Sequence, residues 1–104
     1  MTDRLLTNTK EKFMKIYNIY FSGVQTKDEF YEAIIRAMDF PDWCGKNADA
    51  IWDMMYPDVE YPAHIFLHGT QELPQNLEYR LDLLLQTFEK ARTTYKVELK
   101  VTCI

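Results

Sequence analysis

The sequence predicts a small α/β protein in which a three-stranded parallel sheet packs against helices. Three short segments, residues 15–21, 63–68 and 97–103, have the residue types and spacing of strands. Segments with helical periodicity, residues 26–37 and 76–92, lie between them. Strands that alternate with helices are typical of a parallel sheet, because parallel strands need long crossover connections.

The first strand and helix are marked by clear local signals. Residues 15–21 are rich in Ile and Tyr and stop at a Ser-Gly turn, as strands do. Thr26 and Glu29 match a capping box, and apolar residues follow at helical spacing. Pro41 closes this helix, since proline disfavours helical geometry in the residue before it.

A second, short helix is expected at residues 48–56. Asn47 is a good N-cap for it, and Pro57 must terminate it. At about 100° per residue, the helix has two distinct faces. The inward face is expected to hold Ala48, Ile51 and Met55, and the outward face Asp49, Asp53 and Tyr56.

The C-terminal half supplies the remaining elements. Residues 63–68 form an apolar run of the kind that is buried on both faces of a sheet. Residues 97–103 alternate with period two, which predicts an edge strand with one wet face. The helix at 76–92 should cover the sheet with an apolar stripe made of Leu77, Leu81, Leu84, Phe88 and Ala91.

Length and composition predict one globular domain, with 104 residues of which 47% are hydrophobic. Residues 1–15 are polar and weakly patterned, so we assign them to an N-terminal extension and residues 16–104 to the domain. The start of the chain lacks the apolar run of a signal peptide, and no segment reaches the about 20 apolar residues of a membrane span. The expected location is the cytoplasm, without membrane contact.

The negative charge is concentrated in residues 39–60, which hold six carboxylates and one base, Lys46. That is a net charge of −5, against −4 for the whole chain. An acidic field interleaved with aromatic residues favours a basic protein partner, because complementary potentials speed encounter and fix register. Nucleic acid is not an expected ligand, since its phosphates would be repelled.

Two of these carboxylates are placed at a cost to the helix. Asp53 follows Asp49 by four residues on an exposed face, which destabilises a helix by about 0.2–0.5 kcal/mol. Asp49 gains from the helix dipole in the first turn, but Asp53 does not. With Asp42 and Asp58 nearby, this pattern fits a binding surface. The alternative is an acidic face that is only solvated.

Residues 40–53 resemble the signature of the barstar family of ribonuclease inhibitors; they read Phe-Pro-Asp-Trp-Cys-Gly-Lys-Asn-Ala-Asp-Ala-Ile-Trp-Asp. The family pattern is an apolar residue, Pro, an acid, two aromatics, Gly, any residue, Asn, any residue, Asp, Ala, an aliphatic, Trp and Asp. Residues 59–62, Val-Glu-Tyr-Pro, match a second block that precedes a strand. The resemblance covers residues 16–103 and implies the same fold, a three-stranded parallel sheet packed on helices.

The resemblance implies a monomeric inhibitor, not an enzyme, that forms a 1:1 complex with a basic, extracellular-type ribonuclease. The second helix and the preceding loop would plug the nuclease active site, with carboxylates in the positions of RNA phosphates. Asp53 matches the central plugging aspartate, and Asp49 the other main acidic contact. The full expected partner-binding set is Asp42, Trp43, Gly45, Asn47, Asp49, Asp53 and Tyr56.

Three positions depart from the family pattern. Lys46 replaces an acidic loop residue, Cys44 replaces an aromatic, and Lys90 stands where the family has an acid on the last helix. Because two positions have changed sign, the expected target is a divergent ribonuclease or toxin and not barnase itself. The alternative function is a barstar-like adaptor that binds a basic non-nuclease protein or regulates through self-association.

Catalytic, metal and cofactor sites are not expected. Cys44 with His64 or His68 could be read as a nucleophile and base, but nothing in the sequence brings them together. The two histidines lie on a predicted strand, where their spacing spans about 13 Å, too far for one metal ion. Acid–base catalysis needs a concave, desolvated site, whereas the acidic helix is convex. Both cysteines are expected to be free thiols.

Overall fold

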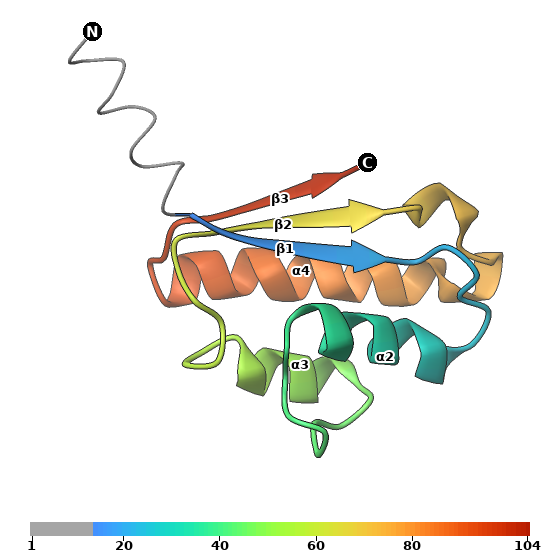
Figure 1. The fold of residues 1–104 in the computed structure, drawn as a ribbon, viewed down its shortest axis with the longest axis horizontal. Coiled ribbons are helices and arrows are strands. Elements are labelled where there is room, and N and C mark those ends of the chain that lie inside the picture. The colour runs from blue at the N-terminus through green and yellow to red at the C-terminus, as the bar shows by residue number, and fades with distance from the viewer. Residues whose placement is uncertain (1–13) are drawn as a thin grey trace, which may run out of the picture.

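The computed structural model describes residues 14–104 (Figure 1). Strands β1 (Lys15–Tyr20), β2 (Ala63–His68) and β3 (Leu99–Cys103) form one parallel sheet in the order β1-β2-β3. In the register, Ile65 of the central strand is opposite Tyr17 on one side and Val101 on the other. The predicted fold class, a small three-stranded parallel sheet packed against helices, is confirmed.

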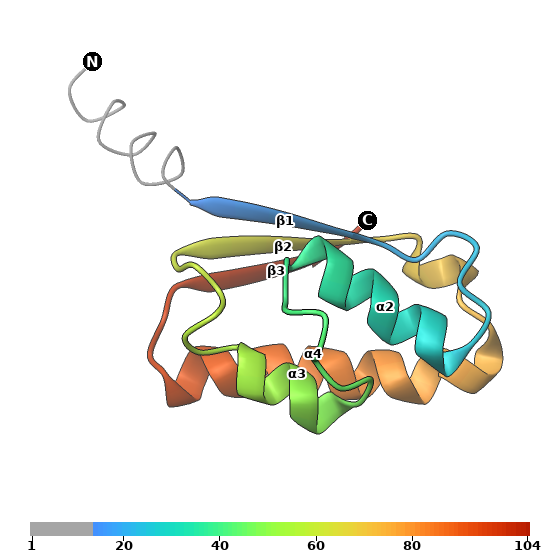
Figure 2. The same cartoon turned by 60° about the horizontal axis from the view of Figure 1, so that its bottom comes forward.

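The helices α2 (Lys27–Ala37), α3 (Ala48–Met54) and α4 (Glu78–Thr94) lie on the same side of the sheet (Figures 1 and 2). Helix α2 contacts β1, and α3 packs against α4. Two short 3-10 helices, η1 (Thr70–Glu72) and η2 (Gln75–Leu77), connect β2 to α4. Because α4 runs under the strands, α3 is held at the side of the helical layer that faces away from the sheet.

The core lies between the sheet and the helical layer. The inner face of the sheet contributes Ile19, Ile65 and Leu67, which are fully buried, and α4 contributes Phe88 and Ala91. Burial of this apolar surface is the main favourable term in folding. The apolar stripe predicted for the last helix is therefore confirmed as its core-facing side.

The prediction that β2 is buried on both faces is wrong. Its residues alternate, so that Ala63, Ile65 and Leu67 are buried while His64, Phe66 and His68 are half-buried. The reason is that no helix of the described residues covers the outer face of the sheet (Figure 2). On this open face, the rings of His64 and Phe66 stack at 4.0 Å between centroids.

Local capping signals set the start of α2 as the sequence predicted. The Glu29 backbone N–H donates to Thr26 Oγ1 at 3.2 Å, and the Thr26 N–H donates to Glu29 Oε1 at 3.1 Å. The N–H groups of Gln25 and Thr26 also lower the pKa of the Glu29 carboxyl, because they stabilise its charged form.

Other boundaries differ slightly from the expected ones. The predicted helix at 76–92 begins with η2 and continues as α4 to Thr94, and β3 begins at Leu99. The predicted N-terminal extension, residues 1–15, falls mostly on residues 1–13, outside the described part of the chain. The described helices include none that is long and apolar enough to cross a bilayer.

Candidate functional site

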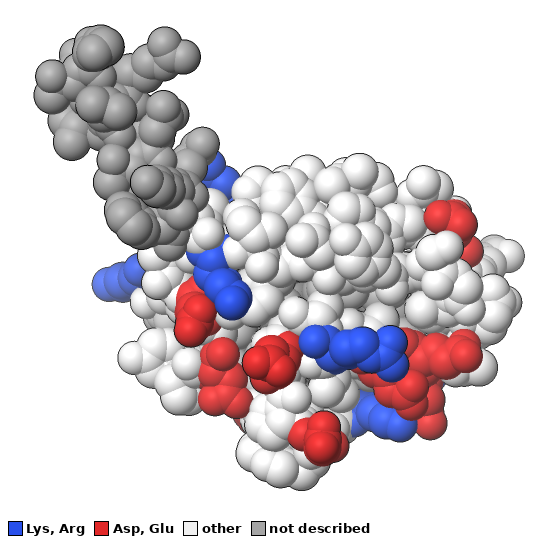
Figure 3. Space-filling model, in the orientation of Figure 1, with Lys and Arg blue, Asp and Glu red and all other residues white. Residues whose placement is uncertain are grey.

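The acidic segment, residues 39–60, lies on a loop at 38–47, on α3 and on a second loop at 55–62. Both loops lie beside α3 on the helical side of the molecule, and the first projects away from the sheet (Figure 1). In Figure 3, acidic side chains gather over the helical layer, while the surface over the strands carries few charges. On the side that Figure 3 shows, Lys and Arg side chains lie among these carboxylates, and both kinds of charge are concentrated over the helical layer and not over the strands.

The first loop leaves α2 through a tightly hydrogen-bonded turn. The Phe40 N–H donates to Ile35 O at 3.0 Å, and the Asp39 N–H donates to Arg36 O at 3.3 Å. This is the pattern of a Schellman motif, in which the residue after the helix cap adopts left-handed geometry. Asp39 occupies that position with φ of 58°, where glycine would be less strained. The motif fixes the direction in which the acidic loop leaves the helix.

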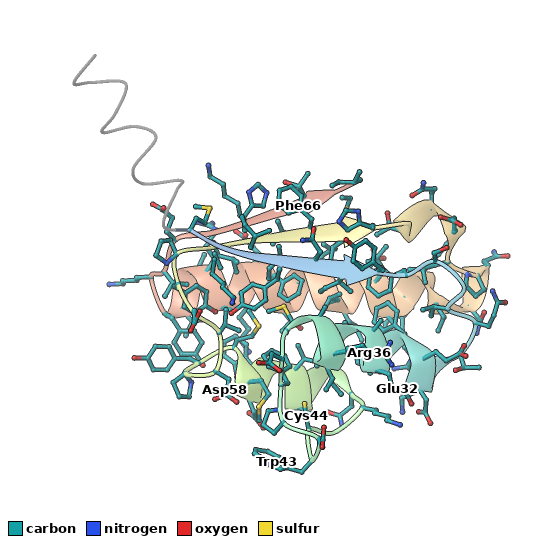
Figure 4. All side chains as sticks on the ribbon, in the orientation of Figure 1. Glu32, Arg36, Trp43, Cys44, Asp58 and Phe66 are labelled. Carbon is teal, nitrogen blue, oxygen red and sulfur yellow. The ribbon has the colours of Figure 1, made fainter. Side chains whose placement is uncertain are left out.

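Two neighbouring residues of the loop point in opposite directions. Cys44 is buried in the core, and its N–H donates to Pro41 O at 2.9 Å. Trp43 is 75% exposed and points away from the body of the molecule at the tip of the loop (Figure 4). The buried Cys44 fixes the loop, and the Trp43 indole remains exposed to solvent. Exposed, well-positioned aromatic side chains of this kind often anchor protein interfaces.

Gly45 and Asn47 bring the loop into α3. A Cβ atom on Gly45 would lie 3.1 Å from both Ala50 Cβ and Asn47 Nδ2, so a side chain there would crowd the start of the helix. Asn47 is the N-cap, as predicted, and its Oδ1 accepts from the Ala50 N–H at 2.8 Å. The side-chain oxygen of Asn47 is thus committed to the helix, and its amide NH₂ group remains for other contacts.

Helix α3 presents its two aspartates outward. Asp49 and Asp53 are both exposed, one turn apart, and we call this pair the aspartate ridge. Ile51, Met54 and Met55 face the core. Ala48, predicted on the inward face, is only half-buried.

The helix is also shorter than predicted. Its last residue is Met54, with Met55 as C-cap, so Tyr56 belongs to the following loop. Tyr56 is 57% exposed, and its ring stacks on that of Tyr95 with 5.1 Å between the centroids.

An aromatic stack between α3 and the end of α4 supports this surface. Tyr95 lies between Trp52, at 5.3 Å between ring centroids, and Tyr56. Lys90 places its Nζ 4.6 Å from the centroid of the Trp52 ring. Sequence reasoning missed Tyr95, although it continues the apolar stripe of α4 four residues after Ala91.

Two tyrosine hydroxyls fix the second loop, one by a bond to the end of α3 and one by a bond from β1. The Tyr61 hydroxyl donates to Met55 O at 2.7 Å, at the end of α3, and the Glu60 N–H donates to Tyr17 Oη at 3.0 Å. Burial, together with the neighbouring Tyr17 and Tyr95, raises the pKa of Tyr61 to about 12. Tyr61 therefore remains a neutral hydrogen-bond donor at physiological pH, and the end of α3 is fixed.

The aspartates of this surface have no basic partner within the described residues. The ion pairs there join Lys15 to Glu60, Lys46 to Glu32 and Arg92 to Glu89. Asp42, Asp49, Asp53 and Asp58 are in none of them.

The lysine within the acidic segment is turned away from this ridge. Lys46 Nζ lies 2.8 Å from Glu32 Oε1 on α2, and this hydrogen bond raises the pKa of the lysine. A base that departs from the family pattern is thus neutralised by a residue from another element. The charge of Lys46 is therefore not available to offset the field of the aspartates.

The structure separates the residues of the nucleophile–base alternative. His64 and His68 project from the outer face of the sheet, where their Nε2 atoms lie 2.8 Å from Thr102 Oγ1 and Asn18 Oδ1. Cys44 lies on the other side of the sheet, in the core. Burial and then the charges of Asp58 and Asp53 raise the pKa of the Cys44 thiol, which disfavours the reactive thiolate.

This burial predicts a difference between the two free cysteines. In the native protein at pH 8, a thiol reagent that releases a coloured product should react rapidly with Cys103, which is exposed, and not with Cys44. Cys44 should react only after denaturant is added, because unfolding both exposes the thiol and lowers its pKa. A Cys103→Ser variant is the control, and it should show no rapid reaction. Rapid labelling of that variant would contradict the burial of Cys44.

Comparison with known proteins places this arrangement in a family. The chain matches the family described as "Barstar (barnase inhibitor)" over residues 14–104. It is also similar to a curated protein of Bacillus subtilis (strain 168) named "Putative ribonuclease inhibitor YrdF". The two are 31% identical over 64 residues, which cover 62% of this chain and 70% of the relative. Since the family match includes the sheet, the helical layer and the whole acidic surface, the chain belongs to the barstar family.

Proposed function

We propose that this protein inhibits a basic ribonuclease by covering its active site in a 1:1 complex. The observation that carries the proposal is the set of aspartates on α3 and its loops that have no basic partner among the described residues. A carboxylate without an internal partner is free to meet the Arg, Lys and His side chains with which a ribonuclease binds phosphate. The protein would then act without chemistry of its own.

Asp53 is the central contact in this proposal, and Asp49 and Asn47 support it. The two aspartates lie on a short helix that Asn47 caps and whose inner side is packed into the core, so the ridge is pre-organised and little entropy is lost on binding. Trp43 and Tyr56 flank the ridge as exposed aromatic anchors. Charge pairs surrounded by aromatic contacts that exclude water are typical of binding hot spots.

The backbone of the loop completes the surface. Gly45 is half-exposed between Trp43 and the start of α3, so a partner could approach its peptide groups closely. Asp42, which precedes Trp43 in the loop, adds an exposed carboxylate. The names of the family and of the Bacillus subtilis relative support the choice of a ribonuclease as the partner. Such an inhibitor would guard RNA in the cytoplasm of a cell that makes a secreted nuclease.

The proposal is tested by titrating the purified protein into RNA-cleavage assays of a panel of small basic ribonucleases, including any encoded beside its gene. Inhibition should be stoichiometric, with the end point at one inhibitor per enzyme. Absence of inhibition across the panel, with the protein shown to be folded, would contradict the proposal and favour the adaptor alternative.

The same complex should show a salt-dependent association rate. Exposed charges are screened beyond about 8–10 Å at physiological ionic strength, so the association rate constant should fall as salt is raised from about 0.01 to 0.15 M. Stopped-flow mixing at several salt concentrations measures this directly. An association rate that is indifferent to salt would show that the acidic field does not guide encounter.

A further inference from the structure

The positive charge of Lys90 on α4 lies beside the aspartate ridge. Lys90 and Asp49 line the same hollow, which has a volume of about 210 Å³. Trp52 and Thr87 contribute to its walls, and Gln86 adds an exposed amide. The surface of this protein that we propose binds the ribonuclease therefore carries opposite charges within one depression.

The charge of Lys90 is not neutralised by another described residue. The neighbouring Glu89 is engaged by Arg92, whose Nη2 and Nε donate to its two carboxylate oxygens at 2.6 and 3.0 Å. None of the ion pairs among the described residues includes Lys90, in contrast to Lys46, which is held by Glu32. Lys90 is thus the base beside the ridge whose charge remains available to a partner.

The position of Lys90 is also constrained before any partner binds. Its ammonium lies 4.6 Å from the centre of the Trp52 ring, within the range of a cation–π interaction. Trp52 is itself stacked on Tyr95. A lysine side chain normally loses much rotamer freedom when it forms a contact, and this packing reduces that loss on binding.

We infer that the target ribonuclease carries a carboxylate opposite Lys90, next to the basic residues that meet Asp49 and Asp53. This inference rests on the proposed function and specifies the partner of that same surface. A uniformly basic nuclease face would meet Lys90 with repulsion, and its charge would be buried without a partner, which is costly. The adjacent pair Asp49 and Lys90 requires an adjacent base and acid on the partner, and this sets register and excludes other nucleases.

The test is whether Lys90→Glu raises or lowers the dissociation constant of the complex. It uses a ribonuclease that the wild-type protein inhibits stoichiometrically. Lys90→Glu makes the surface more acidic, so attraction to a uniformly basic partner would tighten the complex. The inference predicts the opposite, a dissociation constant raised about tenfold or more, because an attractive pair becomes a repulsive one. Lys90→Arg, which keeps the charge and the contact with Trp52, should retain binding within a few-fold.

A matched control and a partner scan complete the experiment. Lys100→Glu makes the same charge change on β3, on the open face of the sheet, and should change the dissociation constant little. Replacing surface acids of the ribonuclease one at a time should reveal one whose loss cancels the effect of Lys90→Glu in a double-mutant cycle.

The outcomes separate the two proposals. Unchanged or tighter binding of Lys90→Glu, with the wild-type protein still inhibiting, would overturn this inference alone. Failure of the wild-type protein to inhibit any ribonuclease would overturn both the inference and the proposed function.

Discussion

Asp53→Ala is expected to raise the dissociation constant of the complex with an inhibited ribonuclease by at least about 30-fold, or about 2 kcal/mol. The substitution leaves a basic group of the nuclease buried at the interface without its partner, which costs more than the lost contact itself. Folding should be nearly unaffected, because Asp53 is exposed. The free energy of unfolding should rise by about 0.2–0.5 kcal/mol, since repulsion from Asp49 is removed. Inhibition titrations and urea unfolding measure the two effects separately.

A charge-matched variant makes this result specific. Glu72→Ala removes the same charge from η1, at the other end of the sheet from α3, where the side chain is also exposed. It should lower the association rate slightly through the net charge and leave the dissociation rate unchanged. If both variants weaken binding equally, the net negative charge of the protein and not the specific contacts of the aspartate ridge would explain inhibition. If Asp53→Ala unfolds the protein, the assignment of Asp53 to the surface is wrong.

Phe88→Ala is expected to lower the free energy of unfolding by about 3–5 kcal/mol. Phe88 is 1% exposed in the core between α4 and the sheet, and truncation leaves a cavity that its neighbours fill only partly. Small domains have a total stability of about 5–15 kcal/mol, so this one change removes a large part of it. Urea unfolding followed by circular dichroism gives the free energy, with the slope compared to that of the wild type.

Tyr79→Ala is the control on the same helix. Tyr79 is 66% exposed, so its truncation should change the free energy of unfolding by no more than about 0.5 kcal/mol. A loss of similar size in both variants would mean that burial does not set the cost of truncation on α4, since alanine itself favours a helix at either position. A loss below about 1 kcal/mol for Phe88→Ala would contradict the position of Phe88 in the core.

The parts of this fold that could be predicted are those encoded by residues close together in the sequence. The caps Thr26 and Asn47 act on N–H groups within three residues, so residue type alone identifies them. The spacing of apolar residues reflects burial on one side of a strand or helix. This spacing predicts the strands and helices, and hence the parallel sheet and the buried stripe that contains Phe88. The resemblance to the family motif also indicates which loop and helix to consider as the candidate site, the loop at 38–47 and α3.

The features that were missed depend on contacts between distant segments. Lys46 looks like a charge within the acidic surface, but Glu32 from α2 pairs with it. The sequence predicts Tyr56 in the helix, yet it lies in the following loop and its ring stacks on Tyr95 at the end of α4. The open outer face of β2 depends on where the helices pack, which the residue pattern of a central strand does not report.

The positions of the two tryptophans give this protein an internal reporter. The chain has two tryptophans, and both lie on or beside the proposed interface: Trp43 in water at the loop tip, and Trp52 stacked between α3 and α4. Tryptophan emission of this protein therefore originates where we propose that a nuclease binds. Loss of water around Trp43 would move its emission to shorter wavelength, so complex formation can be followed without any attached dye.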